Sequence, residues 1–396
     1  MAIFTTGDRE HGMHIVGGLY RELCEIPSWD ATMGSGARAA MAVAPLAQST
    51  EFTTYASAFD RVALATLEAF GITVTIADRS SPIVFAYFHP LSSPHIEPRR
   101  DAIANHPPLR VTGKAVLRFG FLEGEAIVTA GRAVYDPQTW RNPPPFGANG
   151  STAEELALVM NELEIQKCTG MTDIADAADH LIRSAAAQVV VVKQGPYGAT
   201  VFEAGGGYSH VPAYRSASVF KIGTGDIFSA IFAHYWAEMN IPATIAADLA
   251  SRSVSVYCET RMMEFDHTVL ASRQPVLAHR GASVRLETAT EGIGQRYVLE
   301  EVRLALSELG VRVVCPVLEE GISGETFDAT FVIDGDLPSD SLARITHDIT
   351  EGCAVVLLNE RGGTSLPATR PILTVSDFTT SIYFAAWAAG EAALKR

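Results

Sequence analysis

The chain of 396 residues has only five cysteines, and no two of them form a CxxC pair. Cysteines so scattered exclude a disulfide framework and a cysteine zinc site, and they indicate reduced thiols. The histidines form no HxH or HExxH pattern, which argues against a transition-metal site. The sequence also lacks an apolar run of roughly 18 residues and an apolar signal-peptide core, so we expect a cytoplasmic protein with no membrane partner.

Basic residues are also scarce. The sequence has 30 Lys and Arg against 45 Asp and Glu, a net charge of −15. This balance excludes a generally basic binder of nucleic acid polymers, although a small phosphorylated ligand needs only a local site. Residues 275–396 carry a net charge of −7 and the first 274 residues carry −8, so the last part is about twice as acidic per residue.

Apolar strand patterns alternate with helical patterns along the chain. The clearest strand is the β-branched run Gln188–Lys193, which is typical of a buried parallel strand. We expect a helix over Thr152–Lys167, with Ser151 as its N-cap. The alternation predicts an α/β protein with a central, mostly parallel sheet covered by helices. Helical character stops near Ser272–His279, so we expect one domain over residues 1–272 and a smaller α/β domain over 273–396.

The segment Lys221–Ala230 carries the most chemical information. Two glycines, Gly223 and Gly225, come directly before Asp226 at the start of a helix. A helix N-terminus after glycines presents free N–H groups to an anion, and a neighbouring carboxylate can take a proton from an attacking hydroxyl. The alternative interpretation is an ordinary glycine turn in which Asp226 only caps the helix.

This segment resembles the Gly-Ala-Gly-Asp signature of the ribokinase-like (PfkB) carbohydrate and nucleoside kinases. The resemblance spans roughly residues 12–265, and four further segments fall in the order of the family: Gly34–Ala40, Asp136–Pro137, Asn161–Glu164 and Val189–Phe202. It implies a ribokinase-like fold for the first domain and ATP with Mg²⁺ as cofactors.

The resemblance also implies a role for each matching residue. Asp226 would be the catalytic base beside an anion hole, Asn161 and Glu164 would act through magnesium and water, and Glu22 would grip acceptor hydroxyls. The candidate residues are, for catalysis, Gly223, Thr224, Gly225 and Asp226; for the cofactor, Asn161, Glu164, Lys193, Gln194, Gly195 and Lys221, with Glu164 near the metal; and for the acceptor, Glu22, Gly34, Gly36 and Arg38.

Two departures from the family pattern matter for the chemistry. Phe220, Lys221 and Ile222 replace the usual acidic and Thr residues before the glycines, and Lys221 is either a point charge on a phosphate or a solvated loop lysine. Arg38 replaces the usual Asn, which suggests an acceptor with an anionic or planar group. There is no Walker motif, and no obvious strand precedes Gly34–Ala39, which disfavours a dinucleotide fingerprint.

The last 110 or so residues resemble the nucleoside 2-deoxyribosyltransferases, through Tyr297–Pro316 and Phe327–Gly335. The resemblance implies a flavodoxin-like α/β domain of that type, with Asp334 and Asp336 at its site. Arg344 stands where the nucleophilic Glu of that family is expected. The domain is then either a nucleoside sensor or a glycosyl-bond enzyme that uses Asp340 or Asp348, and a third interpretation makes these acids a solvated rim.

Two functions follow from these patterns. The first is an ATP- and Mg²⁺-dependent kinase that phosphorylates a hydroxymethyl group of a nucleoside or sugar, with a nucleoside-binding domain fused to it. The second is a nucleotide sensor with little turnover, which the altered residues Phe220–Ile222 and Arg344 favour. In both, the partner is a small molecule and no nucleic acid polymer, and we consider a homodimer as the assembly.

Overall fold

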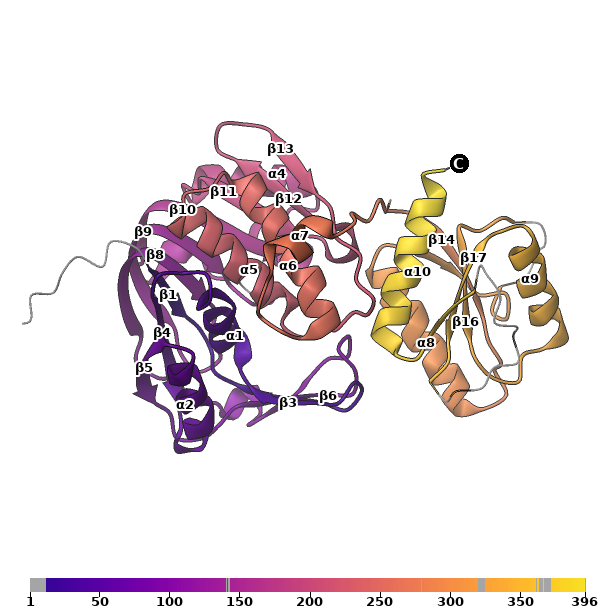
Figure 1. Ribbon diagram of the computed structural model, residues 1–396, viewed down its shortest axis with the longest axis horizontal. Helices are drawn as coiled ribbons and strands as arrows, with labels where there is room; N and C mark the ends of the chain where they lie inside the picture. Colours follow the sequence, from indigo (N-terminus) through magenta and orange to yellow (C-terminus); the bar gives the residue numbers. More distant parts are fainter. Residues whose placement is uncertain are drawn as a thin grey trace, which may run out of the picture.

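A sheet of nine strands forms the centre of the first part of the chain (Figure 1). The computed structural model describes residues 12–139, 141, 143–278, 280–319, 325–360, 362, 366 and 372–395. All neighbouring strands are parallel except the hairpins at one edge, β11–β12 and β12–β13. The strand order is β13 (Tyr208–Val211), β12 (Ala199–Glu203), β11 (Val189–Lys193), β10 (Thr152–Asn161), β9 (Ala126–Asp136), β8 (Leu109–Phe119), β1 (Met13–Val16), β4 (Thr50–Ala56) and β5 (Ile72–Asp78).

Helices cover both faces of this sheet. On one face, α1 (Gly34–Val43), α5 (Thr224–Ala233) and α6 (Ala243–Thr260) bury a core that includes Phe52 and Phe232 (Figure 1). On the other face, α3 (Glu162–Thr169) and α4 (Ile174–Ser184) cover a second core. Parallel strands buried on both faces must be apolar throughout, which explains the run Val189–Val192. The expected mostly parallel sheet covered by helices is confirmed.

Shorter elements complete this part of the chain. The helix α2 (Arg61–Ala69) contacts β5, and α7 (His267–Ser272) follows α6. A π-helical turn, η5 (His234–Glu238), continues α5. Four short 3₁₀ segments are η1 (Ala58–Asp60), η2 (Arg100–Ala102), η3 (Phe146–Asn149) and η4 (Gly195–Tyr197).

The helix expected over Thr152–Lys167 is wrong in its first ten residues. These residues form β10, and only Glu162–Thr169 is helical, as α3. The helix starts further along the chain, at a capping box formed by Asn161 and Glu164. Asn161 accepts a hydrogen bond from the N–H of Glu164, and the Glu164 carboxylate accepts one from the N–H of Asn161. Residues 156–160 are buried between β9 and β11, and a short buried apolar run has no periodicity that separates strand from helix.

A small second sheet lies beside the carboxyl end of the main sheet. Its order is β3 (Trp29–Thr32), β2 (Arg21–Cys24), β6 (Val84–Tyr87) and β7 (His95–Glu97). We call it the lid sheet. The turn after β6 reaches the second domain, where His89 lies 3.4 Å from the Glu301 carboxylate and its ring packs at a tilt against the ring of Phe378.

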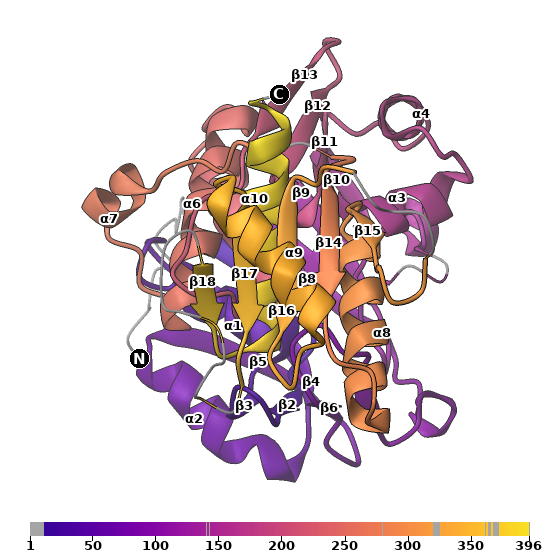
Figure 2. The ribbon, with the colours of Figure 1, turned by 90° about the vertical axis from the view of Figure 1, so that its right-hand side faces the viewer.

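The second domain is a five-stranded parallel sheet. Its order is β15 (Arg312–Val314), β14 (Ser283–Glu287), β16 (Ala329–Ile333), β17 (Ala354–Leu358) and β18 (Ile372–Val375), as Figure 2 shows. Counted along the chain, this is the order 2-1-3-4-5 of flavodoxin-like folds. One face packs against α8 (Ile293–Glu308) and α10 (Phe378–Ala393), and the other against α9 (Ser339–Thr350). The flavodoxin-like arrangement expected for this domain is therefore present.

The two domains are joined by residues 273–282, between α7 and β14. The helix α10 lies on the side of the second domain that faces the first (Figure 1). Tyr383 and Trp387 of α10 share a buried apolar cluster with Val219, Cys258 and Val276. Among the described residues, no helix has the length and apolar character needed to span a membrane.

Candidate active site

Three cavities meet at one side chain, Lys221. The lid cavity, of about 380 Å³, lies under the lid sheet and includes Asp226 in its wall. The interdomain cavity, of about 540 Å³, lies between the domains and includes Lys193 and Glu164. The apolar cavity, of about 100 Å³, lies between α6 and α10. Lys221 lines all three, and Gly225 lines the last two, so ligands bound in these cavities would meet at the start of α5.

The start of α5 depends on Gly223. Its φ of +79° is in the left-handed region, and a Cβ on this residue would lie 2.2 Å from Nε of Arg38. The Ile227 N–H makes a 3.0 Å bond to the Gly223 carbonyl. The N–H groups of Gly225 and Asp226 belong to the first turn, where a helix leaves them without intrahelical acceptors. This end of α5 can therefore receive an anion.

Asp226 is buried and held by two donors. Its Oδ2 accepts a bond of 2.6 Å from Nη1 of Arg38, and its Oδ1 accepts one of 2.6 Å from Nε2 of Gln138. Each carboxylate oxygen has a second lone pair, so Asp226 keeps the capacity to accept a further proton or hydrogen bond in the lid cavity.

Arg38 lies beneath the lid cavity and is not among the residues of its wall. Its side chain is fully buried and connects three elements. It forms an ion pair with Glu22 as well as Asp226, and it donates to the hydroxyl of Tyr257 at 3.1 Å. Burial raises the pKa of Glu22, and the charge of Arg38 opposes this change. The structure thus places Arg38 as a support for two carboxylates.

Of the other residues expected to touch an acceptor, two line the lid cavity and one does not. Glu22 and Gly34 line the lid cavity, together with aromatic and polar side chains. Gly36 does not, because it packs against the main chain of Gly17 and the ring of Phe52, where a Cβ would lie 2.5 Å away. The remaining lining side chains include Tyr20, Ser35, Phe85, Tyr87, Arg100 and Gln138.

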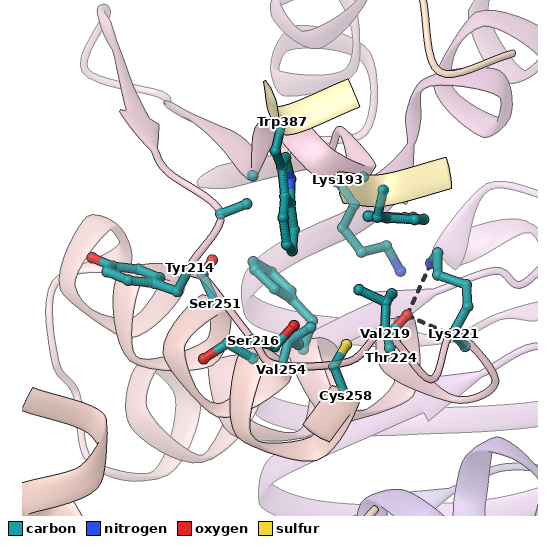
Figure 3. Close-up of a pocket in the computed structure, with 17 residues that line it drawn as sticks. Lys193, Tyr214, Ser216, Val219, Lys221, Thr224, Ser251, Val254, Cys258 and Trp387 are labelled. Atoms are coloured by element: carbon teal, nitrogen blue, oxygen red, sulfur yellow. Dashed lines mark hydrogen bonds between the residues drawn. The ribbon is translucent and has the colours of Figure 1, made fainter. Parts of the chain in front are cut away.

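Two lysines approach the start of α5 from different elements (Figure 3). Lys193 donates to Oδ2 of Asp136 at 2.6 Å, which also accepts from Ser229. Burial lowers the pKa of Lys193, but Asp136 and Glu164 outweigh this effect and raise it overall. Lys221 donates to Oγ1 of Thr224 at 2.9 Å.

Lys221 differs from Lys193 in its partners. Within the described part of the chain, it forms no salt bridge. Burial, with a contribution from the charge of Lys193, lowers the pKa of Lys221. A half-buried ammonium group beside free N–H groups is incompletely compensated, and a bound phosphate would supply the missing negative charge.

The carboxyl edge of the sheet brings together the residues expected near magnesium. Asp136, Asn161 and Lys193 end β9, β10 and β11, and Glu164 follows one turn after Asn161. Burial and the nearby Asp136 raise the pKa of Glu164 to about 7. The charge of Lys193, whose Nζ lies 2.6 Å from Oδ2 of Asp136, opposes this rise, and oxygen ligands of this type suit Mg²⁺.

The remaining expected cofactor residues lie beside this edge. Gln194 and Gly195 line the interdomain cavity. Gln194 donates to Glu162 at 3.0 Å and accepts from Thr200 at 2.8 Å. Among the described residues there is no cluster of three or more His, Cys, Asp or Glu side chains able to hold a metal. A magnesium ion here would keep mostly water and phosphate ligands, as Mg²⁺ often does.

Two residues that were not among the candidates prove central. Asp136 belongs to the Asp-Pro pair that resembles the family, so the sequence contained a signal for it. Gln138 had none: it follows Pro137 in a loop, at a φ of +55°, and reaches Asp226 across 88 positions of sequence. Only the folded chain brings these two together.

In the second domain, some of the acidic residues expected at its site are paired and others are exposed. Arg344, at the position expected for a nucleophilic Glu, donates two bonds to the buried Glu287, at 2.6 and 2.8 Å. Asp348 pairs with Arg285 and accepts from Thr330, while Asp340 is exposed. Asp334 directly follows β16 and is half-buried, and Asp336 is exposed.

Comparisons with known proteins show local similarity to one kinase family and partial similarity to solved kinase structures. No curated protein matches it. Solved structures with a partly similar chain trace include a ribokinase from Thermotoga maritima, at 15% identity over 67% of this chain and 96% of that chain, with a TM-score of 0.43. A phosphofructokinase-2 variant from Escherichia coli is 13% identical over 66% and 97%, with a TM-score of 0.47.

A third structure is a pyrophosphate-dependent kinase of the ribokinase family, bound to a pyrophosphate analogue and myo-inositol. It is 14% identical over 62% of this chain and 95% of that chain, with a TM-score of 0.42. The family comparison is more direct: it covers β10 to the end of α6 and includes Asn161, Glu164, Lys193 and Gly223–Asp226. Residues 152–261 of this chain match the family described as pfkB family carbohydrate kinase.

Proposed function

We propose that the chain is a kinase that transfers a phosphoryl group from a phosphoanhydride donor to a hydroxymethyl group of a small sugar or nucleoside. ATP with Mg²⁺ is the donor implied by the family resemblance. One observation carries the proposal: Lys221 lines both the lid cavity, which contains Asp226, and the interdomain cavity, which contains Lys193. An acceptor and a donor held in these cavities would meet where the free N–H groups of α5 point.

The lid cavity supports the role of acceptor site. Its volume of about 380 Å³ lies within the usual range for small-molecule sites. Aromatic rings of Tyr20, Phe85 and Tyr87 offer faces for a sugar or a base, and Glu22 and Gln138 offer hydrogen-bonding groups. This mixture favours a neutral polyol or nucleoside over a strongly charged acceptor.

Asp226 is suited to act as the base. In the proposed step the acceptor oxygen forms a bond to phosphorus, the bond from phosphorus to the bridging oxygen breaks, and Asp226 takes the hydroxyl proton. Arg38 and Gln138 hold the carboxylate at 2.6 Å each, so it is oriented before the acceptor binds. Such a base contributes roughly 10²–10⁴-fold to a rate.

The developing charge would be stabilised by Lys193, Lys221 and the N–H groups of Gly225 and Asp226. Glu164 and Asp136, together with Asn161, would hold Mg²⁺ through water, and the ion would neutralise charge on the donor phosphates. The raised pKa of Glu164 supports this role, because a cation would return the carboxyl group to its ionised form.

The proposal is tested with a panel of sugars and nucleosides, with Mg²⁺ and either ATP or pyrophosphate as donor. Phosphorylated products are identified by mass spectrometry for the wild type, Asp226→Asn and Asp179→Asn. The control residue Asp179 is exposed on α4 and lines none of the three cavities. A product that the wild type and Asp179→Asn make, and that Asp226→Asn makes at least roughly 10²-fold more slowly, supports the proposal. Equal rates in all three proteins would reject Asp226 as the base.

For the second domain we propose nucleoside binding without glycosyl transfer. Asp334 lies at the carboxyl end of β16, and ligands of open α/β sheets bind at this edge, near the strands where the order reverses. The pair between Arg344 and Glu287 favours binding over catalysis, because it engages a buried carboxylate instead of leaving it free. Calorimetric titration with nucleosides, compared between the wild type and Asp334→Asn, tests this; release of free base by the wild type would overturn it.

A nucleotide sensor with little turnover is the second candidate for the whole chain. The observation that favours it is that Phe220, Lys221 and Ile222 replace the usual acidic and Thr residues before the glycines. Tight binding of ATP or pyrophosphate with no phosphorylated product from any acceptor in the panel would favour this candidate.

A further inference from the structure

The second domain forms part of the wall of the apolar cavity. Trp387 of α10 lies across this cavity from Val254 and Cys258 of the first domain (Figure 3), and Tyr383 of the same helix also lines it. Both side chains are buried, with exposed fractions of 5% and 4%. The far end of the cavity is lined by Lys193, Lys221 and Gly225, the residues of the proposed phosphate site.

Directional contacts hold α10 in this place. The indole N–H of Trp387 donates to the Pro196 carbonyl at 3.1 Å. The main-chain N–H of Val219 donates to Oγ1 of Thr380 at 2.9 Å, and Arg215 forms an ion pair with Glu391. These contacts start from Thr380, Trp387 and Glu391, which are spread over about three turns of one helix, so they define its position against the first domain.

The interdomain cavity and the apolar cavity suit different parts of a phosphate donor. The interdomain cavity contains Asp136, Glu164, Lys193 and Arg280, so it suits charged phosphates and a cation. The apolar cavity suits the flat, apolar faces of a base. A base attached to phosphates at Gly225 would therefore extend between α6 and α10.

The room left there is too small for a nucleoside. The apolar cavity has a volume of about 100 Å³, whereas sites for ligands of drug size have roughly 300–1,000 Å³. The rings of Tyr383 and Trp387 fill the space into which a base would extend.

We propose that Tyr383 and Trp387 determine donor specificity: with α10 docked, the site takes an inorganic phosphoanhydride, of which pyrophosphate is the smallest, and excludes nucleoside triphosphates. This inference rests on the proposed phosphoryl transfer and names its donor class. In the step, the acceptor oxygen bonds to one phosphorus of pyrophosphate, the bond to the bridging oxygen breaks, and inorganic phosphate leaves. The acceptor proton passes to Asp226.

The test measures binding, so that it does not depend on turnover. The full-length wild type, Trp387→Ala and Phe384→Ala are titrated by calorimetry with pyrophosphate and with ADP, each with Mg²⁺. Phe384 is the matched control, because it is an aromatic residue of α10 that packs beside Trp387 but does not line the cavity. We expect the wild type and Phe384→Ala to bind pyrophosphate. Both should bind ADP at least roughly tenfold more weakly than pyrophosphate, a difference of about 1.4 kcal/mol.

Trp387→Ala is expected to bind ADP at least roughly tenfold more tightly than the wild type does, with pyrophosphate binding unchanged. Thr380→Val provides a second variant that keeps side-chain volume and removes one docking bond; it should also strengthen ADP binding. The inference is overturned if Trp387→Ala and Thr380→Val bind ADP no more tightly than the wild type does. It is also overturned if Phe384→Ala strengthens ADP binding as much as Trp387→Ala does. If these binding results hold but Asp226→Asn forms product as fast as the wild type, the base assignment fails and the donor-site inference stands.

Discussion

The guanidinium of Arg38 forms buried ion pairs with both Glu22 and Asp226, and its Nη1 lies 2.6 Å from Oδ2 of Asp226. Arg38 is on α1 and Asp226 is on α5, so this contact fixes the proposed base relative to the wall of the lid cavity. Arg38, which stands where the resemblance implies an Asn, thus contacts two carboxylates of the chain itself.

Replacing Arg38 by Met is expected to destabilise the protein, because two buried carboxylates would lose their cation. Breaking a buried ion pair in this way typically costs about 3–5 kcal/mol. Urea unfolding measures the loss, with Arg21→Met as control, since Arg21 and Asp30 form an exposed pair worth about 0–1 kcal/mol. Equal losses in the two variants would show that Arg38 does not support these carboxylates.

Gly223→Ala is expected to unfold at lower denaturant concentration than the wild type. The φ of +79° costs a residue with a Cβ about 1–2 kcal/mol, and the new methyl group would displace Arg38. Gly205→Ala is the matched control, because a Cβ there meets nothing within 4 Å. Activity should fall in Gly223→Ala even at temperatures where it is folded. Unfolding midpoints that agree between the two variants would contradict this account.

Lys221→Met should weaken donor binding more than acceptor binding. Lys221 lines every one of the three cavities and has no described carboxylate partner, so a bound phosphate is its natural counter-charge. We expect the KM for the donor to rise roughly tenfold, about 1.4 kcal/mol, and the KM for the acceptor to change less. Lys167→Met, on the exposed end of α3, should leave both unchanged. A larger rise in the acceptor KM would place Lys221 at the acceptor.

Glu164 should make stability depend on pH. Its pKa in the folded protein, about 7, lies above the ordinary value of 4.5, so the folded chain holds this proton more tightly than the unfolded chain. The resulting stability is fully present below pH 4.5 and is lost as the pH rises through 7. The stability of the wild type relative to Glu164→Gln should therefore fall between pH 5 and pH 8, as thermal unfolding at each pH would show.

The effect of magnesium on the melting temperature is a second test of the role of Glu164. At pH 8 the ion should raise the melting temperature of the wild type more than that of Glu164→Gln, since only the wild type has an ionised carboxylate at position 164. Acidification below pH 7 should reduce this difference, because protons and Mg²⁺ compete for Glu164. An equal effect of magnesium on both proteins would remove Glu164 from the cation site.

Much of the fold could be predicted from local pattern. Alternating apolar strands and helices indicated a mostly parallel sheet, because such strands are buried on both faces and their patterns are strong. The prediction failed at Thr152–Asn161, where a strand with a short buried apolar run follows residues that resemble a helix start. Its true state depends on pairing with β9 and β11, which lie far away in sequence.

The candidate site was likewise predictable only where its features are local in sequence. The order Gly-Thr-Gly-Asp at 223–226 by itself determined a glycine turn at a helix start, because the backbone geometry and the free N–H groups there are local. Only the tertiary structure decided that Arg38 supports Asp226 and that Gln138 reaches it. It also decided that Trp387, from the other domain, closes the apolar cavity. These contacts join residues 88 to 191 positions apart, and no spacing in a sequence reports which distant side chains share a cavity.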